Sequence, residues 1–224
     1  MKKALVFVDG QNLFYSLKNM GLTESQIQWD SLFSSLVDEN DELIRVYWYQ
    51  PQKLTNPELT FDKAMRFTGK NYPGKPPLEL EEIAKRELER ARAWSQEQSQ
   101  KYNKQLHRYD EMSIKYPVVE MVRKGIVRID AFKQEYLGEK GVDVALAVNM
   151  IKFHEKCDKL ILISGDLDYA EAIQFVKDNL KKVHLVRFFR GSPPINKSVS
   201  RTLMALADKV IDLYEEEIKS KHLI

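Results

Sequence analysis

The sequence predicts an α/β fold in which helices flank a central parallel sheet. Two nearly continuous apolar runs, residues 4–8 and 160–163, are typical of parallel strands covered on both faces. Each run ends in a turn that carries aspartates, and a segment with helical spacing of apolar residues follows it. This alternation predicts right-handed crossovers, with the first strand in the middle of the sheet and the strand ending near Ser164 beside it.

The same patterns predict the other elements of the core. Apolar residues at alternating or continuous positions predict further strands at residues 43–49, 126–132, 182–186 and 210–213. Helical spacing predicts helices at residues 29–37, 142–151, 169–179 and 198–207. Residues 138–141 are predicted to form a loop, and the polar tail from Glu215 is predicted to be frayed.

Residues 78–116 differ from the rest of the chain. Apolar residues recur there at helical spacing from Leu80 to Tyr109, and no glycine or proline interrupts them before Pro117. We predict a long helical insertion within a single domain that spans residues 1–224, either as one helix of about 57 Å, at 1.5 Å per residue, or as a helical hairpin broken near residues 95–99. Two interpretations stay open: a solvated helix packed along one stripe, or an arm that forms a homo-oligomer or holds a long substrate.

Composition bounds the function. The formal net charge of +2 over 224 residues is too small to indicate a nucleic-acid partner by itself. A single cysteine, Cys157, excludes an intrachain disulfide framework and a zinc site built from several cysteines, and it is typical of a reducing compartment. No apolar run is long enough to cross a bilayer, and the N-terminus does not resemble a signal peptide. We therefore expect a cytoplasmic protein without a membrane partner.

Aspartates gather at the expected functional edge of the sheet. Asp9 ends the first strand, Asp166 and Asp168 follow the strand at 160–163, and Asp143 lies in the first turn of a predicted helix. Taken singly, each has a structural explanation as a turn residue, a helix cap or a partner of the helix dipole. Together they predict one pocket, and a cluster of carboxylates without His or Cys suits Mg²⁺ or Mn²⁺.

Four segments resemble the motifs of one family. Residues 6–13 (VFVDGQNL) resemble the opening motif of NYN domains, a branch of the PIN-like nucleases. Residues 140–147 resemble their central motif, residues 164–169 their third motif, and residues 200–208 their closing segment. The motifs occur in the family's order, and the resemblance covers about residues 1–50 and 118–213.

The resemblance implies a PIN-like, Rossmann-like fold and metal-dependent cleavage of RNA, with single-stranded RNA as the favoured substrate. It implies catalytic and metal-binding roles for Asp9, Asp143, Asp166 and Asp168. It also implies that Asn12 supports the site. Basic side chains at the rim would bind the flanking phosphates, although each could equally be a solvated loop charge. The candidates are Lys140, Arg187, Arg190 and Lys197.

Two alternatives stay open. Many NYN relatives carry an aspartate where this chain has Asn149, so the chain could be a catalytically weakened NYN module that binds RNA or another protein. The turn at residues 165–168 also loosely resembles the metal turn of haloacid-dehalogenase phosphotransferases. That chemistry requires an acid two residues after the nucleophilic aspartate, and Gln11 follows Asp9 at that spacing, so this alternative ranks lower.

Overall fold

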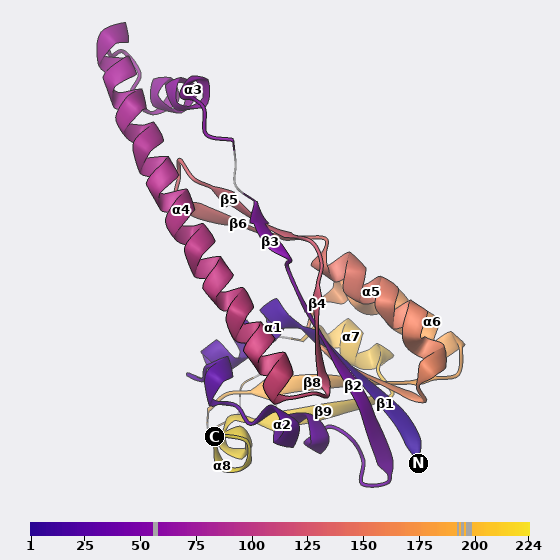
Figure 1. Cartoon of the computed structure of the whole chain (residues 1–224). Coiled ribbons are helices and arrows are strands. Elements are labelled where there is room, and N and C mark those ends of the chain that lie inside the picture. Colours follow the sequence, from indigo (N-terminus) through magenta and orange to yellow (C-terminus); the bar gives the residue numbers. More distant parts are fainter. Residues whose placement is uncertain (56–57, 192, 194, 196–198) are drawn as a thin grey trace. The chain divides into compact units, whose positions relative to one another are not determined.

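The computed structural model describes residues 1–55, 58–191, 193, 195 and 199–224, and it contains two compact units (Figure 1). The first unit comprises residues 1–50, 110–124 and 141–224. The second comprises residues 51–109 and 125–140. Each unit is built around its own sheet.

The sheet of the first unit has six strands, all of them parallel, in the order β4-β2-β1-β7-β8-β9. This confirms the predicted α/β class, with the first strand in the interior of the sheet and the strand before Ser164 beside it. The strands are β1 (Lys2–Asp9), β2 (Asp41–Gln50), β4 (Val119–Arg123), β7 (Lys159–Ile163), β8 (Lys182–Phe189) and β9 (Lys209–Tyr214).

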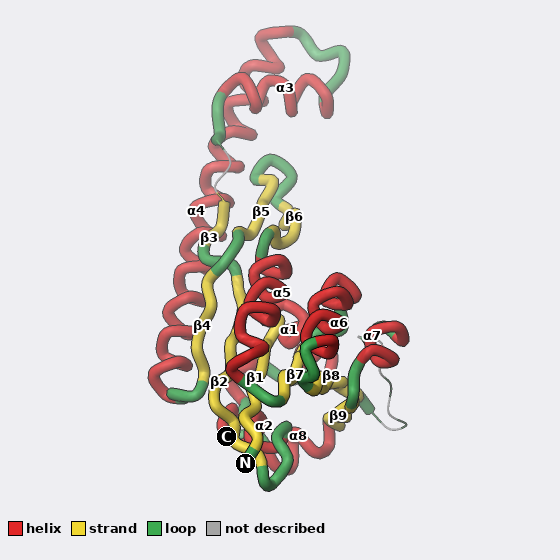
Figure 2. Tube along the Cα trace, turned by 90° about the vertical axis from the view of Figure 1, so that its right-hand side faces the viewer, coloured by secondary structure: helices red, strands yellow, loops and turns green. Residues whose placement is uncertain are grey.

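Helices cover both faces of this sheet, which explains the continuous apolar runs at residues 4–8 of β1 and 160–163 of β7. On one face Phe7 and Leu162 pack against Leu146 of α5 and Ile173 of α6, two helices that lie side by side in Figures 1 and 2. On the other face Trp29 of α2 meets Trp48 of β2 edge to face at 4.7 Å. The helices of this unit are α1 (Gly10–Asn19), α2 (Trp29–Ser35), α5 (Val142–Phe153), α6 (Ala170–Asp178), α7 (Arg201–Leu206) and α8 (Glu215–Lys221). Its short 3₁₀ turns are η1 (Glu24–Gln26), η2 (His154–Lys156) and η3 (Leu167–Tyr169).

The second unit contains a three-stranded sheet, the helix α3 (Phe61–Asn71) and most of α4. Its strands are β3 (Lys53–Thr55), β5 (Ile126–Asp130) and β6 (Glu135–Lys140), and β5 lies between the other two. The helix α4 runs unbroken from Pro77 to Lys115, which confirms one long helix over the hairpin alternative, and its residues 110–115 belong to the first unit.

The apolar stripe of α4 is covered by the protein's own chain in the second unit. Trp94 and Tyr102 pack against the core of the small sheet. Closer to the start of the helix, Ala84 and Leu88 pack against Ala64 of α3. The stripe therefore does not require a second chain for its burial.

Three predictions of secondary structure were wrong. Residues 126–132 form a strand only to Asp130, and that strand pairs antiparallel with β6 in the second unit, because alternation identifies a strand but not its partner. The predicted loop at 138–141 is largely the end of β6, where Gly138 adopts a left-handed φ of 89° at an irregular pairing. The tail from Glu215 is not frayed, since α8 buries Ile218 and carries i,i+4 ion pairs.

A further strand, β4, was not predicted. It is an edge strand whose residues are mostly only partly buried, so its short apolar pattern is interrupted by charges. Within the described part of the chain, no helix is long and apolar enough to cross a membrane.

Candidate functional site

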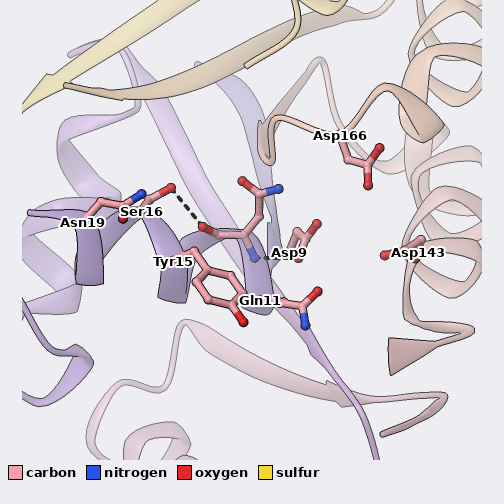
Figure 3. A pocket seen from close by; sticks show the side chains of 8 residues that line it. Asp9, Gln11, Tyr15, Ser16, Asn19, Asp143 and Asp166 are labelled. Carbon is pink, nitrogen blue, oxygen red and sulfur yellow. Dashed lines mark hydrogen bonds between the residues drawn. The ribbon is translucent and has the colours of Figure 1, made fainter. Parts of the chain in front are cut away.

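A pocket of about 260 Å³ lies where β1 ends and α1 begins (Figure 3). Carboxylates and neutral polar groups line it, and none of the lining residues is a lysine or an arginine. The lining residues are Asp9, Gln11, Asn12, Tyr15, Ser16, Asn19, Asp143 and Asp166. Three of the four predicted aspartates therefore line one pocket, together with Asn12.

Asp9, the last residue of β1, is almost fully buried and accepts three hydrogen bonds. Its Oδ1 accepts the backbone N–H of Asn12 at 3.0 Å, so Asp9 caps α1. Its Oδ2 accepts the hydroxyls of Ser164 at 3.0 Å and Tyr169 at 3.3 Å. These contacts fix both carboxylate oxygens at the floor of the site.

Two glycines place the acids. A Cβ on Gly10 would lie 2.6 Å from the carbonyl oxygen of Tyr49, so only glycine lets α1 begin directly after Asp9 against the end of β2. Gly141 caps α5 with a φ of 86°, in the left-handed region that favours glycine. That turn places Asp143 in the first turn of α5, where it is half-buried.

The loop after β7 is held by its own hydroxyl and carboxylate. Asp166 caps η3 by accepting the backbone N–H of Asp168 at 3.1 Å. The N–H of Asp166 in turn donates to Oγ of Ser164, the same hydroxyl that donates to Asp9. Asp168 is exposed and, unlike the other three acids, does not line the pocket.

Two longer-range bonds join three of the four motif segments at this loop. The backbone N–H of Gly165 donates to Oδ1 of Asn12 at 3.3 Å. The backbone N–H of Ser200, which precedes α7, donates to the carbonyl of Gly165 at 3.4 Å. Asn12 thus supports the site by positioning the loop that carries Asp166.

Sequence reasoning missed Tyr169, a fully buried residue. Its hydroxyl lies 3.3 Å from a carboxylate oxygen of Asp9 and 3.3 Å from one of Asp143. One hydroxyl proton can be donated to only one of these two acceptors at a time. The only available signal was its position directly after Asp168, where it could be taken for an ordinary core aromatic.

The two acids that share this hydroxyl are electrostatically strained. Burial raises the pKa of Asp9 above its usual value, the hydrogen bonds that it accepts offset part of this rise, and the charge of Asp143 adds to it. Burial also raises the pKa of Asp143; the bond from Tyr169 offsets part of the rise, and Asp166 and Asp168 add to it. Carboxylates here face one another without a neighbouring cation from the lining residues.

The donor set fits a partly hydrated hard cation. Among the described residues, no three His, Cys, Asp or Glu side chains are arranged to hold a metal ion together. Mg²⁺, however, usually keeps several waters and binds through one or two carboxylates. Asp9 and Asp143 provide such a pair, with Asp166 in the same lining, and their all-oxygen chemistry suits Mg²⁺ or Mn²⁺.

None of the three predicted phosphate-binding cations that the structure describes is among the residues that line the pocket. Arg187 forms a two-pronged ion pair with Asp212, at 2.8 and 2.7 Å, so its guanidinium is already engaged. Arg190 is exposed after β8, and Lys140 ends β6 in the second unit. Lys197 lies outside the described residues.

Asn149, where the resemblance to NYN domains led us to expect an aspartate, has a structural partner. Its side-chain amide donates to the hydroxyl of Tyr49 at 2.8 Å. Tyr49 is fully buried near the end of β2, so this bond satisfies a polar group inside the core. The alternative of a catalytically weakened module, which depends on this residue, stays a prediction.

Comparison with known proteins agrees with the motifs and the fold. The NYN domain model matches residues 3–215. A crystal structure of a protein of unknown function from Vibrio parahaemolyticus is similar with a TM-score of 0.53 and 16% identity, covering 100% of this chain and 96% of that one. At this identity the similarity shows the fold alone. No curated protein matches the sequence.

Proposed function

The chain belongs to the NYN domain family of PIN-like nucleases, and we propose that it is a metal-dependent ribonuclease. The observation that carries the proposal is the pair Asp9 and Asp143, which share the hydroxyl of Tyr169 and both have a raised pKa. Two carboxylates in this arrangement favour a cation between or beside them. Nucleases of this family are typically metal-dependent, and the family suggests RNA as the substrate.

Each residue of the site has a distinct task in this proposal. Asp9 and Asp143 would hold Mg²⁺ or Mn²⁺, with Asp166 completing the lining and Asp168 contributing its charge from outside the pocket. When bound, the ion would lower the pKa of a water and neutralise charge on the phosphoryl oxygens.

The supporting residues fix the orientation of the acids. Ser164 holds Oδ2 of Asp9 and the backbone of Asp166 at once, so it couples two of the proposed ligands. The hydroxyl of Tyr169 can donate a hydrogen bond to either Asp9 or Asp143. It can therefore orient towards whichever of the two carboxylates is ionised. Such supporting hydrogen bonds commonly change metal affinity or activity by about 10–100-fold when they are removed.

The test is cleavage of single-stranded RNA in Mn²⁺ by the wild type and by Asp143→Asn. We expect cleavage by the wild type that stops with chelator, and a rate at least about 100-fold lower for Asp143→Asn. Asp178→Asn is the matched control, because this aspartate ends α6 and bonds only to Gln174 among the described residues. It should cleave like the wild type.

Two results would contradict the proposal. Equal cleavage by all three proteins would identify a contaminating nuclease. Absence of cleavage with RNA still bound would favour the weakened binding module. In that case Asn149→Asp is informative, because the new carboxylate would accept the hydrogen bond of the Tyr49 hydroxyl while adding the charge that many relatives have.

A further inference from the structure

The neutral half of the pocket comes from one face of α1. Gln11, Tyr15 and Asn19 follow one another at a spacing of four residues, and all three are exposed and line the pocket. We call these three residues the α1 stripe. It extends over about 12 Å of helix at 1.5 Å per residue. Figure 3 shows Tyr15 and Asn19 on one side of Asp9, Gln11 below it, and Asp143 and Asp166 on the other side.

Two other polar side chains of the same lining are already hydrogen-bonded within the protein. Asn12 holds the loop at Gly165, and the hydroxyl of Ser16 donates to the carbonyl of Asn12 at 2.9 Å. In contrast, the side chains of Gln11 and Asn19 form no hydrogen bond with any residue that the structure describes. Both therefore present amide donors and acceptors to the pocket.

An aromatic ring lies in the middle of the stripe. Tyr15 is 53% exposed, and its neighbour Phe14, which it meets edge to face at 5.4 Å, is 43% exposed. Two large aromatic side chains exposed next to each other are unusual on a surface that needs only solubility. The ring of Tyr15 lines the pocket while Phe14 does not, so only Tyr15 can meet a ligand in the pocket.

We propose that the α1 stripe binds an unpaired nucleobase of the RNA whose phosphate lies at the acidic half of the pocket. The ring of Tyr15 stacks on the base, as aromatic side chains do in single-strand binding. Gln11 and Asn19 hydrogen-bond to the base edge, because an amide offers both donor and acceptor groups. This inference rests on the proposed function and restricts its substrate to RNA with an accessible base.

The size of the pocket and the chemistry of the stripe support this choice of ligand. A pocket of about 260 Å³ takes a group of nucleotide size and not a duplex. In a duplex each base is stacked between its neighbours, so its face is not available to Tyr15. The stripe also carries no charge, so it would not repel the phosphates on either side of the base.

The experiment measures binding of two labelled chains of equal length by fluorescence anisotropy. One is single-stranded RNA, and the other is the same ribose-phosphate chain without bases. All proteins in this binding experiment, the parent included, carry Asp143→Asn to prevent cleavage, so any effect of this change on phosphate binding is common to every comparison. Tyr15→Ala should bind the RNA about ten-fold more weakly, equivalent to about 1.4 kcal/mol, within the range for one base stack.

Three comparisons give the result its meaning. Tyr15→Phe keeps the ring and should bind RNA within about two-fold of its parent. Phe175→Ala, which removes an aromatic ring of similar exposure (40%) from the second half of α6, should bind like its parent. On the chain without bases, Tyr15→Ala and its parent should have equal affinity, because only stacking distinguishes them.

The amides are tested by base preference. Gln11→Ala and Asn19→Ala should each change the relative affinity for oligomers of the four bases by about two- to ten-fold, the effect of losing one hydrogen bond. Unchanged preference in both variants would contradict their role in reading the base edge.

The outcomes separate this inference from the proposed function. If Tyr15→Ala binds RNA as tightly as its parent, or loses the same affinity for both chains, the α1 stripe does not bind a base. If the wild type cleaves RNA and Tyr15→Ala, made for this assay without Asp143→Asn, cleaves it with the same kcat/KM, the inference fails and the ribonuclease stands. If no variant binds RNA and the wild type does not cleave it, both fail.

Discussion

The two edges of the six-stranded sheet use aspartates in opposite ways. At the carboxyl edge burial raises the pKa of Asp9 and Asp143, and no lysine or arginine lines their pocket. At the amino edge hydrogen bonds from Lys159 lower the pKa of Asp38 and Asp41. The comparison teaches that acids with a lysine partner stabilise the fold. Acids that face one another without a cation keep a charge that a bound ligand can compensate.

The amino edge is a compact ionic network. Lys159, the first residue of β7, is 5% exposed and bonds to Asp38 at 2.5 Å and to Asp41. Lys209, the first residue of β9, bonds to the other oxygen of Asp38 at 2.9 Å. Each acid there has a cation partner, so a metal has nothing to add.

The largest effect should come from removing the buried cation. Lys159→Met leaves Asp41 without its cation partner and removes one of the two partners of Asp38, so it should lower the free energy of unfolding more than Lys209→Met does. Lys209→Met, which breaks an ion pair with both side chains 51% exposed, should cost at most about 1 kcal/mol. Urea unfolding at pH 7 measures both, and equal losses would show that burial does not distinguish the two cations.

A pH effect should be next in size. His184 of β8 is buried near the amino edge; burial first, then Lys159 and Lys209, lower its pKa to about 4. The unfolded chain, with a histidine pKa of about 6.5, therefore takes up a proton first as the pH falls. Stability from His184 is complete above pH 6.5 and is lost towards pH 4, by up to about 3 kcal/mol at 1.4 kcal/mol per pKa unit.

Replacing that histidine separates its contribution. His184→Gln should reduce the loss of stability between pH 6.5 and pH 4, measured by urea unfolding at several pH values. An unchanged pH dependence would mean that other groups cause the loss of stability between pH 6.5 and pH 4. Protonation of His184 would then not destabilise the folded state.

The smallest effect, of opposite sign, should appear at the carboxyl edge. Because the pKa of Asp143 is raised, its charged form is disfavoured in the folded state, and this cost is present above the folded pKa and disappears as the pH falls through it. Asp143→Asn keeps an oxygen for the Tyr169 hydroxyl and should raise the metal-free Tm at pH 7 by about 2–4 °C, the shift for roughly 1 kcal/mol. A lower Tm would show that the carboxylate stabilises the fold.

The sequence allowed the parallel sheet and the three acids that line the pocket to be predicted, for identifiable reasons. Strands covered on both faces have long apolar runs, and the acids at 9, 143 and 166 follow strand ends or begin a helix. Such local features are visible in one dimension. The partner of β5, the helix α8 and the edge strand β4 were not predictable in the same way, because their formation depends on contacts distant in the chain.

The supporting contacts of the site were hidden for the same reason. The bond from Tyr169 to Asp9 joins residues 160 positions apart, and the bond from Ser164 to Asp9 joins residues 155 apart. The sequence indicated the types of residues but not these pairings. The sequence also suggested Arg187 as a phosphate ligand. Its ion pair with Asp212 depends on the register of β8 and β9, so the sequence could not reveal that this guanidinium is already engaged.

The most direct test of the central claim is the thermal shift that Mn²⁺ produces in three proteins. A ligand that binds only the native state at about 100 times its Kd stabilises it by about 2.7 kcal/mol, so the wild type should gain several degrees in Tm. Asp38→Asn, altered at the amino edge, should gain the same increment, while Asp143→Asn should lose most of it. A full Mn²⁺ shift in Asp143→Asn, or its loss in Asp38→Asn, would contradict the assignment of the metal to the unpaired acids of the carboxyl edge.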